Sequence, residues 1–109
     1  MDKEKKISIL VSTFNKSKFI KNTIDSCLNQ NYNNYEIIII DTGSTDETIN
    51  ILKKIASKKK IKVRFLKKKY STGPLNQIYA INSAFNLSNG DIICLLDGDD
   101  IFKKNKLKE

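Results

Sequence analysis

The sequence predicts an α/β fold in which a parallel sheet of about four strands lies between layers of helices. Short β-branched apolar runs alternate along the chain with segments whose apolar residues recur at helical spacing, and polar loops follow several of the runs. Strict alternation of strands and helices implies right-handed crossovers, and hence a parallel sheet covered on both faces. Because a typical domain has about 100 to 200 residues, we expect residues 1–109 to form a single domain.

Residues 7–12 and 35–40 are the first two predicted strands. The second run is continuous and mostly β-branched, which is typical of a strand buried on both faces. A helix is predicted over residues 17–30, and its apolar side chains share one face: Phe19, Ile20, Ile24, Cys27 and Leu28. A second helix is predicted after the second strand, with Ser44 or Thr45 available as its N-cap. Its apolar positions are Ile49, Leu52, Ile55 and Ala56.

The second half of the chain predicts two more strands and one more helix. Residues 61–66 alternate apolar and basic side chains, as an edge strand with one exposed face does, and we expect this strand to be the least buried. Pro74 suits the first turn of a helix that ends near Asn89. The apolar positions of this helix are Leu75, Ile78, Tyr79 and Phe85. Residues 91–96 are then a buried fourth strand.

The net charge of +8 comes almost wholly from lysine. Attraction to nucleic acid or to an anionic membrane surface is one interpretation of this charge. The densest lysine runs, residues 58–60 and 67–69, flank a predicted strand, where solvated lysines are ordinary, so the sequence does not favour nucleic acid as a partner. Cys27 and Cys94 have neither metal-type nor disulfide-type spacing, and we expect both to be buried.

Signals for membrane insertion or secretion are absent from the sequence. The longest apolar runs are only a few residues, far short of the roughly 20 needed to cross a bilayer. The N-terminus leads into the first strand without the apolar stretch of a secretory signal. We therefore expect a cytoplasmic location, and association of a longer protein with the cytoplasmic face of a membrane stays open.

Polar loops follow three of the four predicted strands, at residues 12–15, 41–46 and 97–100. In open parallel sheets, ligands bind outside the carboxyl ends of the strands, where the strand order reverses. If the strand order is 3-2-1-4, all three loops lie at one edge formed by adjacent strands. This edge is the expected site.

The loop Asp97-Gly98-Asp99-Asp100 concentrates three carboxylates in four residues. Like-charge repulsion makes this costly unless a cation or water screens the charges. Mg²⁺ or Mn²⁺ would satisfy them, since hard divalent ions prefer carboxylate oxygens and can bridge to a diphosphate. The alternative is a solvated turn whose carboxylates complement the positive end of a helix starting near Ile101, and the motif alone favours that alternative.

The other two loops also have two interpretations each. Residues 41–46 are either a capped turn or a loop that contacts a nucleotide. In residues 12–15, Phe14 could stack on a nucleobase while Ser12, Thr13 or Asn15 supplies hydrogen bonds, or Phe14 could belong to the core.

Taken together and in this order, these loops resemble the inverting glycosyltransferases of family 2, which have the nucleotide-diphospho-sugar transferase (GT-A) fold. The resemblance covers residues 7–107, and its motifs are specific in combination. They are ILVSTFN at residues 9–15, IIIDTGSTD at 38–46, AIN at 80–82 and LLDGDD at 95–100. The resemblance implies a Rossmann-like, three-layer α/β/α domain with strand order 3-2-1-4.

The resemblance further implies a nucleoside-diphosphate sugar as donor, usually a UDP-sugar, and Mn²⁺ or Mg²⁺ as cofactor. The residues that it implies in nucleotide-sugar binding are Ser12, Thr13, Phe14, Asn15, Asp41, Thr42, Gly43, Ser44, Asp97 and Gly98. The residues that it implies in metal binding are Asp99 with Asp97 or Asp100. The product would be a cell-surface polysaccharide, lipopolysaccharide or glycoconjugate, and the acceptor is not specified.

The resemblance assigns no catalytic residue to this chain. Family members carry their acceptor-binding region and catalytic carboxylate base at positions corresponding to the sequence beyond Glu109. We therefore expect residues 1–109 to be the N-terminal part of a longer enzyme, supplying donor and metal binding, and to be inactive alone.

The chain departs from the family pattern at two positions. Many members have a second Asp where this chain has Thr42, which can still hydrogen-bond a base. Many have Arg where it has Ile81. An arginine lost near the phosphates removes a charge-assisted contact of about 1.5 to 3 kcal/mol, unless lysines 67–69 or Tyr70 compensate.

Two alternative functions stay open at this point. A nucleotidyltransferase of the same fold would be expected to carry a Gly-rich basic loop after its first strand, and residues 12–19 contain no glycine. A basic module for nucleic acid or a membrane surface would use the lysine runs. Its binding would depend steeply on salt and would be indifferent to Asp99.

Overall fold

The computed structural model describes residues 5–67, 73–99 and 101, and strands and helices alternate along the chain. The elements are β1 (Ile7–Thr13), α1 (Ile20–Leu28), β2 (Tyr35–Thr42), α2 (Thr48–Ile55), β3 (Ile61–Leu66), α3 (Gly73–Leu87) and β4 (Ile92–Asp97). The strands form one parallel sheet in the order β3-β2-β1-β4, which confirms the predicted order. Asp100, lysines 68 and 69, and Tyr70 lie outside the described residues.

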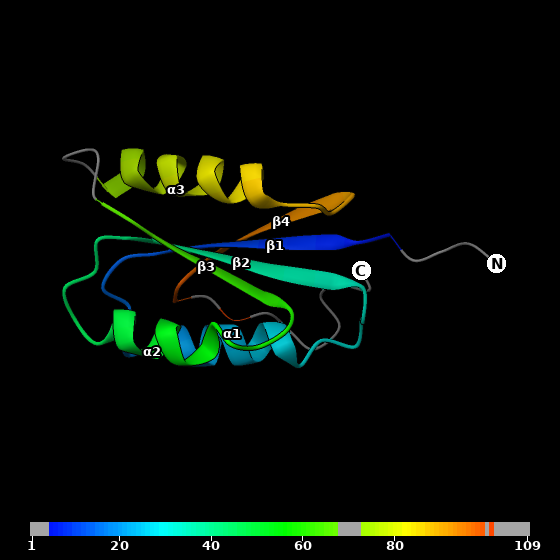
Figure 1. Ribbon diagram of the computed structural model, residues 1–109, viewed down its shortest axis with the longest axis horizontal. Helices are drawn as coiled ribbons and strands as arrows, with labels where there is room; N and C mark the ends of the chain where they lie inside the picture. The colour runs from blue at the N-terminus through cyan, green and yellow to red at the C-terminus, as the bar shows by residue number, and fades with distance from the viewer. Residues whose placement is uncertain (1–4, 68–72, 100, 102–109) are drawn as a thin grey trace.

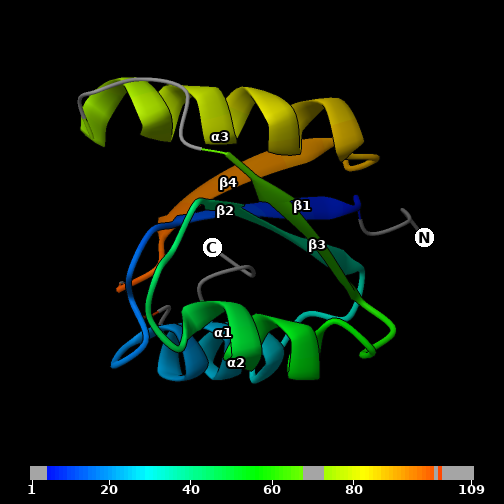
Figure 2. The same ribbon diagram turned by 60° about the vertical axis from the view of Figure 1, so that its left-hand side comes forward.

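The sheet is the middle of three layers, with α3 on one face and α1 and α2 on the other (Figures 1 and 2). Alternate residues of the central strands serve the two faces. The core under α1 and α2 includes Ile9, Val11, Ile24, Ile37, Ile39 and Leu52. The core under α3 consists of Leu10, Ile38, Ile40, Ala80 and Ala84. The two small alanines are the buried residues that α3 contributes to this core.

The helix boundaries differ from the prediction. The segment predicted from residue 17 begins its helix only at Ile20, because residues 17–19 form a turn in which the amides of Phe19 and Ile20 both donate to the Lys16 carbonyl. The predicted N-cap of α2 at Ser44 or Thr45 is wrong: the cap is Glu47, without a side-chain cap hydrogen bond.

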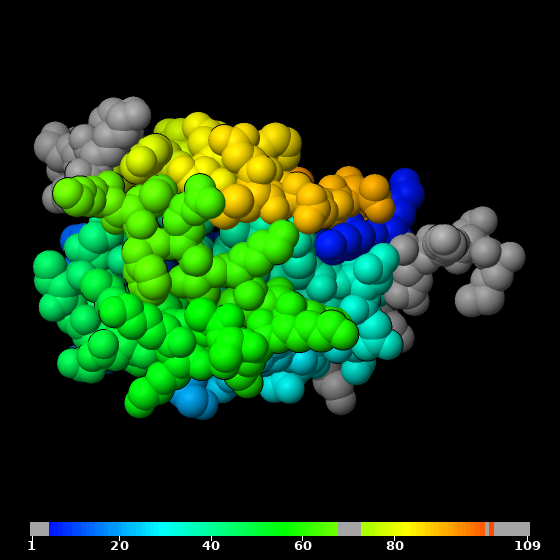
Figure 3. Space-filling model, viewed as in Figure 1, coloured from blue at the N-terminus to red at the C-terminus, as the bar shows by residue number. Residues whose placement is uncertain are grey.

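Both outer strands are exposed, and the prediction of a buried fourth strand is wrong. β3 is an edge strand as predicted, and it faces solvent beside α2 in the space-filling view (Figure 3). Within the described residues, β4 is the opposite edge and pairs with β1 alone. Its Leu95 side chain is 57% exposed and Ile92 is 45% exposed. The described helices include none long and apolar enough to cross a membrane.

The two cysteines differ in burial. Cys27 is fully buried in the core under α1, as predicted, and burial raises the pKa of its thiol to about 12. Such a thiol is unreactive at neutral pH. Cys94 is only partly buried, because β4 lies at the edge of the sheet.

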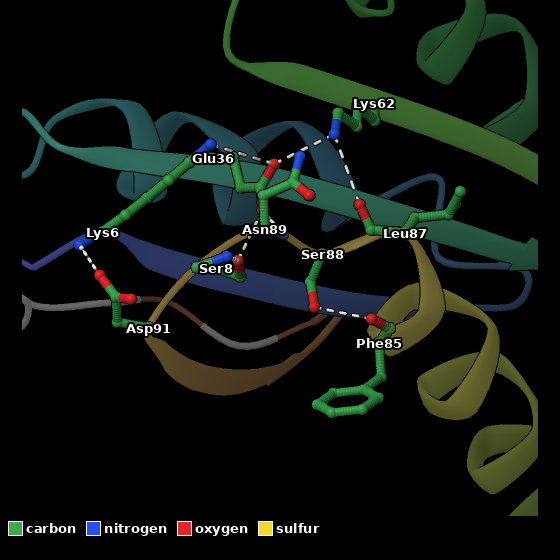
Figure 4. Close-up of polar contacts among 10 residues, drawn as sticks. Lys6, Ser8, Glu36, Lys62, Phe85, Leu87, Ser88, Asn89 and Asp91 are labelled. Carbon is green, nitrogen blue, oxygen red and sulfur yellow. Dashed lines mark hydrogen bonds and ion pairs between the residues drawn. The ribbon is translucent and has the colours of Figure 1, made fainter.

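A buried carboxylate, Glu36, ties the turn between α3 and β4 to the sheet (Figure 4). Its Oε2 accepts hydrogen bonds from the Ser8 hydroxyl and the Asn89 amide, both at 2.6 Å. Its Oε1 lies 3.2 Å from Lys62 Nζ and 3.8 Å from Lys6 Nζ. Burial acts to raise the pKa of Glu36, but the donors from Asn89, Ser8 and Lys62 outweigh it, so the pKa lies below the usual glutamate value.

Candidate functional site

A cavity of about 420 Å³ opens where β1, β2 and β4 end and α3 begins. Its volume is in the range of small-molecule sites. The residues that line it are Ser12, Thr13, Phe14, Lys16, Thr42, Gly73, Pro74, Asn76, Gln77 and Asp97. Five of these residues come from the sequence prediction: Ser12, Thr13, Phe14, Thr42 and Asp97. The structure therefore brings residues of all three predicted loops to one cavity.

The loops after β1 and β2 are held together by hydrogen bonds. The Asn15 amide donates to Ser44 Oγ at 2.8 Å, and the Thr45 amide donates to Asn15 Oδ1 at 2.7 Å. The Lys16 amide donates to Thr48 Oγ1 at 3.0 Å. Asn15 has a φ of 52°, a left-handed conformation that asparagine tolerates better than most residues. Asn15 and Ser44, both predicted to contact the nucleotide, therefore join the two loops to each other.

Asp41 shapes the loop after β2. Its side chain is buried, and Oδ2 accepts the amides of Gly43 at 3.2 Å and Ser44 at 3.0 Å. The Ser44 hydroxyl also donates to Oδ1. Gly43 has a φ of 88°, which favours glycine. The carboxylate of Asp41 is thus engaged by its own loop, and the neighbouring Thr42 is the residue of this loop that lines the cavity.

Asp46 fixes the same loop to the start of α1 and α2. It accepts the amides of Ser17 at 3.3 Å and Thr48 at 3.0 Å. Burial acts to raise the pKa of Asp46, but hydrogen bonds from Thr48 and Ser17 outweigh it and lower the pKa to about 2. Asp46 is therefore ionised at neutral pH and holds the loops as a charged acceptor.

The acidic loop packs directly on β1. Asp97 Oδ1 accepts a hydrogen bond from Gln77 Nε2 at 2.6 Å and from Ser12 Oγ at 3.2 Å. The Gly98 amide donates to the Ser12 carbonyl at 3.0 Å. A Cβ on Gly98 would lie 2.6 Å from Thr13 Oγ1 and 2.9 Å from Thr13 Cβ, so the close approach requires glycine.

The carboxylates of Asp97 and Asp99 have the oxygen chemistry that a divalent cation prefers. Among residues 5–67, 73–99 and 101, no group of three or more His, Cys, Asp or Glu side chains is placed to hold a metal. Asp97 lines the cavity, and Asp99 follows two residues later with its Oδ2 3.2 Å from Nζ of the cavity residue Lys16. Mg²⁺ is commonly held by one or two carboxylates together with water and substrate phosphates, so these two carboxylates would suffice. The metal role predicted for Asp100 stays a prediction, because this residue lies outside the described part of the chain.

One buried hydroxyl beside the cavity lacks a partner. Thr13 Oγ1 is inaccessible to solvent and makes no hydrogen bond to any described residue. Buried polar atoms in native proteins almost always have a partner. Thr13 Oγ1 lies 2.6 Å from the point that a Cβ on Gly98 would occupy, so the acidic loop covers this hydroxyl.

The sequence prediction of the site missed five cavity residues, namely Lys16 and four residues at the start of α3: Gly73, Pro74, Asn76 and Gln77. Lys16 follows the predicted 12–15 loop directly, so extending the loop by one residue would have found it. Asn76 and Gln77 lie in the first turns of α3, and only the path of that helix across the sheet brings them to the cavity. Ile81 packs against the core under α3 and does not line the cavity.

The parallel sheet, the helices on both faces and the cavity at the carboxyl ends of the strands define a Rossmann-like α/β domain, in which such a cavity is where ligands bind. The sequence model of the family "Glycosyl transferase family 2" matches residues 8–109. The chain belongs to glycosyltransferase family 2.

Two bacterial glycosyltransferases are among the relatives of this chain. An uncharacterised glycosyltransferase of Haemophilus influenzae is 39% identical over 94% of this chain and 40% of its own length. The poly(ribitol-phosphate) β-N-acetylglucosaminyltransferase TarP of Staphylococcus aureus is 36% identical over 96% of this chain and 32% of its own length. The chain thus spans two fifths of the length of one relative and about a third of the other.

A solved structure shares the fold. The crystal structure of S. aureus TarS 1–349 in complex with UDP-GlcNAc superposes with a TM-score of 0.81 at 29% identity, over 94% of this chain and 29% of that one. This similarity and the observed strand order identify the domain as GT-A, as the sequence predicted.

Proposed function

We propose that this domain binds a nucleoside-diphosphate sugar, with UDP as the nucleotide, together with Mn²⁺ or Mg²⁺, for transfer of the sugar to an acceptor. The observation that carries the proposal is the cavity, where Phe14, Thr42 and Asp97 converge from three loops. A site that combines an aromatic face, hydroxyl groups and carboxylates suits a ligand with a base, a ribose and a metal-bound diphosphate.

The residues have separate proposed tasks. Phe14 is 41% exposed and lines the cavity, and its proposed task is to stack its ring on the base. Thr42 offers a hydroxyl to the base edge, Ser12 offers a hydroxyl to the ribose or phosphate, and Thr13 supports the acidic loop through its contact with Gly98. Asn15, Asp41, Gly43 and Ser44 hold the loops that place Phe14 and Thr42. Asp97 and Asp99 would hold the cation, which supplies charge neutralisation for the departing nucleoside diphosphate.

The relatives support the choice of donor. TarS is solved with UDP-GlcNAc, and TarP is named as an N-acetylglucosaminyltransferase acting on poly(ribitol-phosphate). We propose that the longer protein works on the cytoplasmic side of the membrane, where a nucleotide sugar is available. The described residues include no assigned catalytic base, so the proposed task of this part is donor and metal binding, and we propose that alone it does not transfer sugar.

Calorimetric titration of the folded domain with UDP in the presence of Mn²⁺ tests the proposal. We expect saturable binding that EDTA weakens. Asp97→Asn should weaken UDP–Mn²⁺ binding by about tenfold or more, because a charge-assisted contact is removed. Asp91→Asn is the matched control, since Asp91 precedes the same strand at its other end and accepts the Lys6 amide.

Two results would contradict the proposal. One is a folded wild-type domain that does not bind UDP with Mn²⁺. The other is equal loss of binding in Asp97→Asn and Asp91→Asn, which would place the effect on the strand as a whole. Binding to an arbitrary DNA duplex that is steeply salt dependent and unaffected by Asp97→Asn would instead favour a basic nucleic-acid module.

A further inference from the structure

An ion pair joins the first loop of the site to the acidic loop. Lys16 Nζ lies 3.2 Å from Asp99 Oδ2, between side chains that are 37% and 40% exposed. Lys16 also lines the cavity. The carboxylate that is proposed to receive the divalent cation therefore already has a cation of the protein beside it.

The position of Lys16 is set by the fold. Its amide donates to Thr48 Oγ1, and its carbonyl accepts the amides of Phe19 at 2.9 Å and Ile20 at 2.8 Å at the start of α1. Its Cγ lies 3.2 Å from the point that a Cβ on Gly98 would occupy, so the side chain passes directly over Gly98. The backbone hydrogen bonds of Lys16 and the packing of its side chain over Gly98 therefore direct the ammonium toward the acidic loop.

We infer that the Lys16 ammonium is an exchangeable internal counter-ion of Asp99, displaced when a divalent cation binds with a nucleoside diphosphate. This inference rests on the proposed function. An ammonium and a divalent cation repel each other, so they compete for the same carboxylate. Because a half-exposed ion pair is weak, the exchange is energetically accessible. Because Lys16 lines the cavity, its displaced ammonium can then pair with the anionic diphosphate of the bound nucleotide.

Lys16 should therefore weaken the binding of the divalent cation alone and strengthen the binding of the nucleotide. Without nucleotide, the cation must displace Lys16 and the ammonium gains no new partner. With a diphosphate present, the displaced ammonium gains an anionic partner, so nucleotide and cation each strengthen the binding of the other. A lysine that only stabilises the loop would weaken or strengthen both binding events together.

The test is Lys16→Met, which keeps an apolar stem over Gly98 and removes the charge. Mn²⁺ binding without nucleotide should become about two- to fivefold tighter, the size expected from losing a weak competing ion pair. UDP binding at saturating Mn²⁺ should become about tenfold weaker through loss of a charge-assisted contact. Uridine binding should not change, since uridine has no diphosphate. Free Mn²⁺ is measured by electron paramagnetic resonance, and UDP and uridine binding by calorimetry.

Two further variants act as controls. Lys21→Met removes another lysine of the same region, one whose ammonium pairs with Asp25 at 3.0 Å on the exposed face of α1. It should leave all three affinities unchanged. Lys16→Arg keeps the charge and should keep the weak binding of Mn²⁺ alone, whatever Lys16→Met does to folding.

The outcomes separate this inference from the proposed function. If wild type binds UDP with Mn²⁺ but Lys16→Met does not bind Mn²⁺ alone more tightly, the counter-ion exchange is overturned and the proposed function stands. The exchange is also overturned if Lys16→Arg binds Mn²⁺ alone more tightly than wild type, because the charge would then be irrelevant. If the folded wild type binds no UDP with Mn²⁺, both proposals are overturned.

Discussion

Replacement of the buried Glu36 by Gln or by Leu should destabilise the fold by clearly different amounts. The two neutral donors, the Ser8 hydroxyl and the Asn89 amide, both reach Oε2, whereas the two lysines approach Oε1. A glutamine can place its carbonyl oxygen at the Oε2 position and keep both neutral donors. A leucine removes every acceptor. The two substitutions therefore separate the contribution of charge from that of hydrogen bonding.

The magnitudes follow from these contacts. Lys6 and Lys62 are partly exposed and can turn to water, so Glu36→Gln loses mainly the charge-assisted part, about 1 to 2 kcal/mol. Glu36→Leu leaves the Ser8 hydroxyl and the Asn89 amide without their acceptor, at about 1 to 3 kcal/mol each. We therefore expect Glu36→Leu to lower the free energy of unfolding by about 3 to 5 kcal/mol, after part of the loss is offset by apolar burial.

Urea unfolding followed by circular dichroism at neutral pH measures both values. Because Glu36 lies near the amino end of β2 and the cavity lies at the carboxyl ends of the strands, UDP–Mn²⁺ affinity of the folded variants should stay within about twofold of wild type, as for sites without shared partners. Equal destabilisation by Gln and Leu would refute the assignment of the two neutral donors to Oε2. A Leu variant as stable as wild type would refute the argument that these donors depend on Glu36.

The remaining predictions concern pH and the glycines. Because folding lowers the pKa of Glu36, its ionised carboxylate stabilises the fold above the unfolded-state pKa, and this stabilisation is lost as pH falls through the folded-state pKa. The difference in unfolding free energy between wild type and Glu36→Gln should therefore shrink on acidification, which urea unfolding at stepped pH measures. Folding also lowers the pKa of Asp46, so the stabilisation from its carboxylate should be lost as pH falls from about 4 to the folded-state pKa of about 2. NMR titration of the Asp46 carboxyl measures this pKa. Gly98→Ala should lower the free energy of unfolding by about 1 to 3 kcal/mol through overpacking on Thr13. Gly73→Ala should not lower it, because nothing lies within 4 Å of the new Cβ. Equal losses in urea unfolding would show that the contact with Thr13 is not the cause.

The sequence predicted the layers and the strand order for different reasons. Apolar runs and helical periodicity are patterns among neighbouring residues, so the seven elements within residues 7–97 could be predicted from the sequence of each segment by itself. The order 3-2-1-4 came from the family resemblance, because nothing in the spacing of the runs fixes which strands are neighbours. The exposure of β4 could not be predicted, since an apolar run such as Ile92 to Leu96 looks the same in a central strand and at an edge.

The site was predictable where it lies in loops and not where it depends on helix placement. The loops after β1, β2 and β4 carry polar residues at the ends of strands, and parallel pairing brings such ends together. Gln77 donates to Asp97 across 20 residues of sequence, which requires the crossing of α3 over the sheet. Asp41 and Ser44 were predicted as ligand contacts from the family resemblance, whereas their hydrogen bonds within the loop depend on the turn at Gly43.

The position of the acidic loop depends on polar contacts with β1 more than on burial of its own strand. Ser8 and Ser12 lie on the same face of β1, opposite Ile93 and Asp97 in the register of the sheet. At one end Ser8 Oγ accepts the Gly90 amide at 2.8 Å, and at the other Ser12 Oγ donates to Asp97. In the part of the chain that the structure describes, β4 has one paired neighbour and exposes much of its apolar surface, so packing restrains it less than the central strands. The two serines therefore fix both ends of β4 against the most buried part of the sheet, and this fixes where Asp97 stands in the cavity.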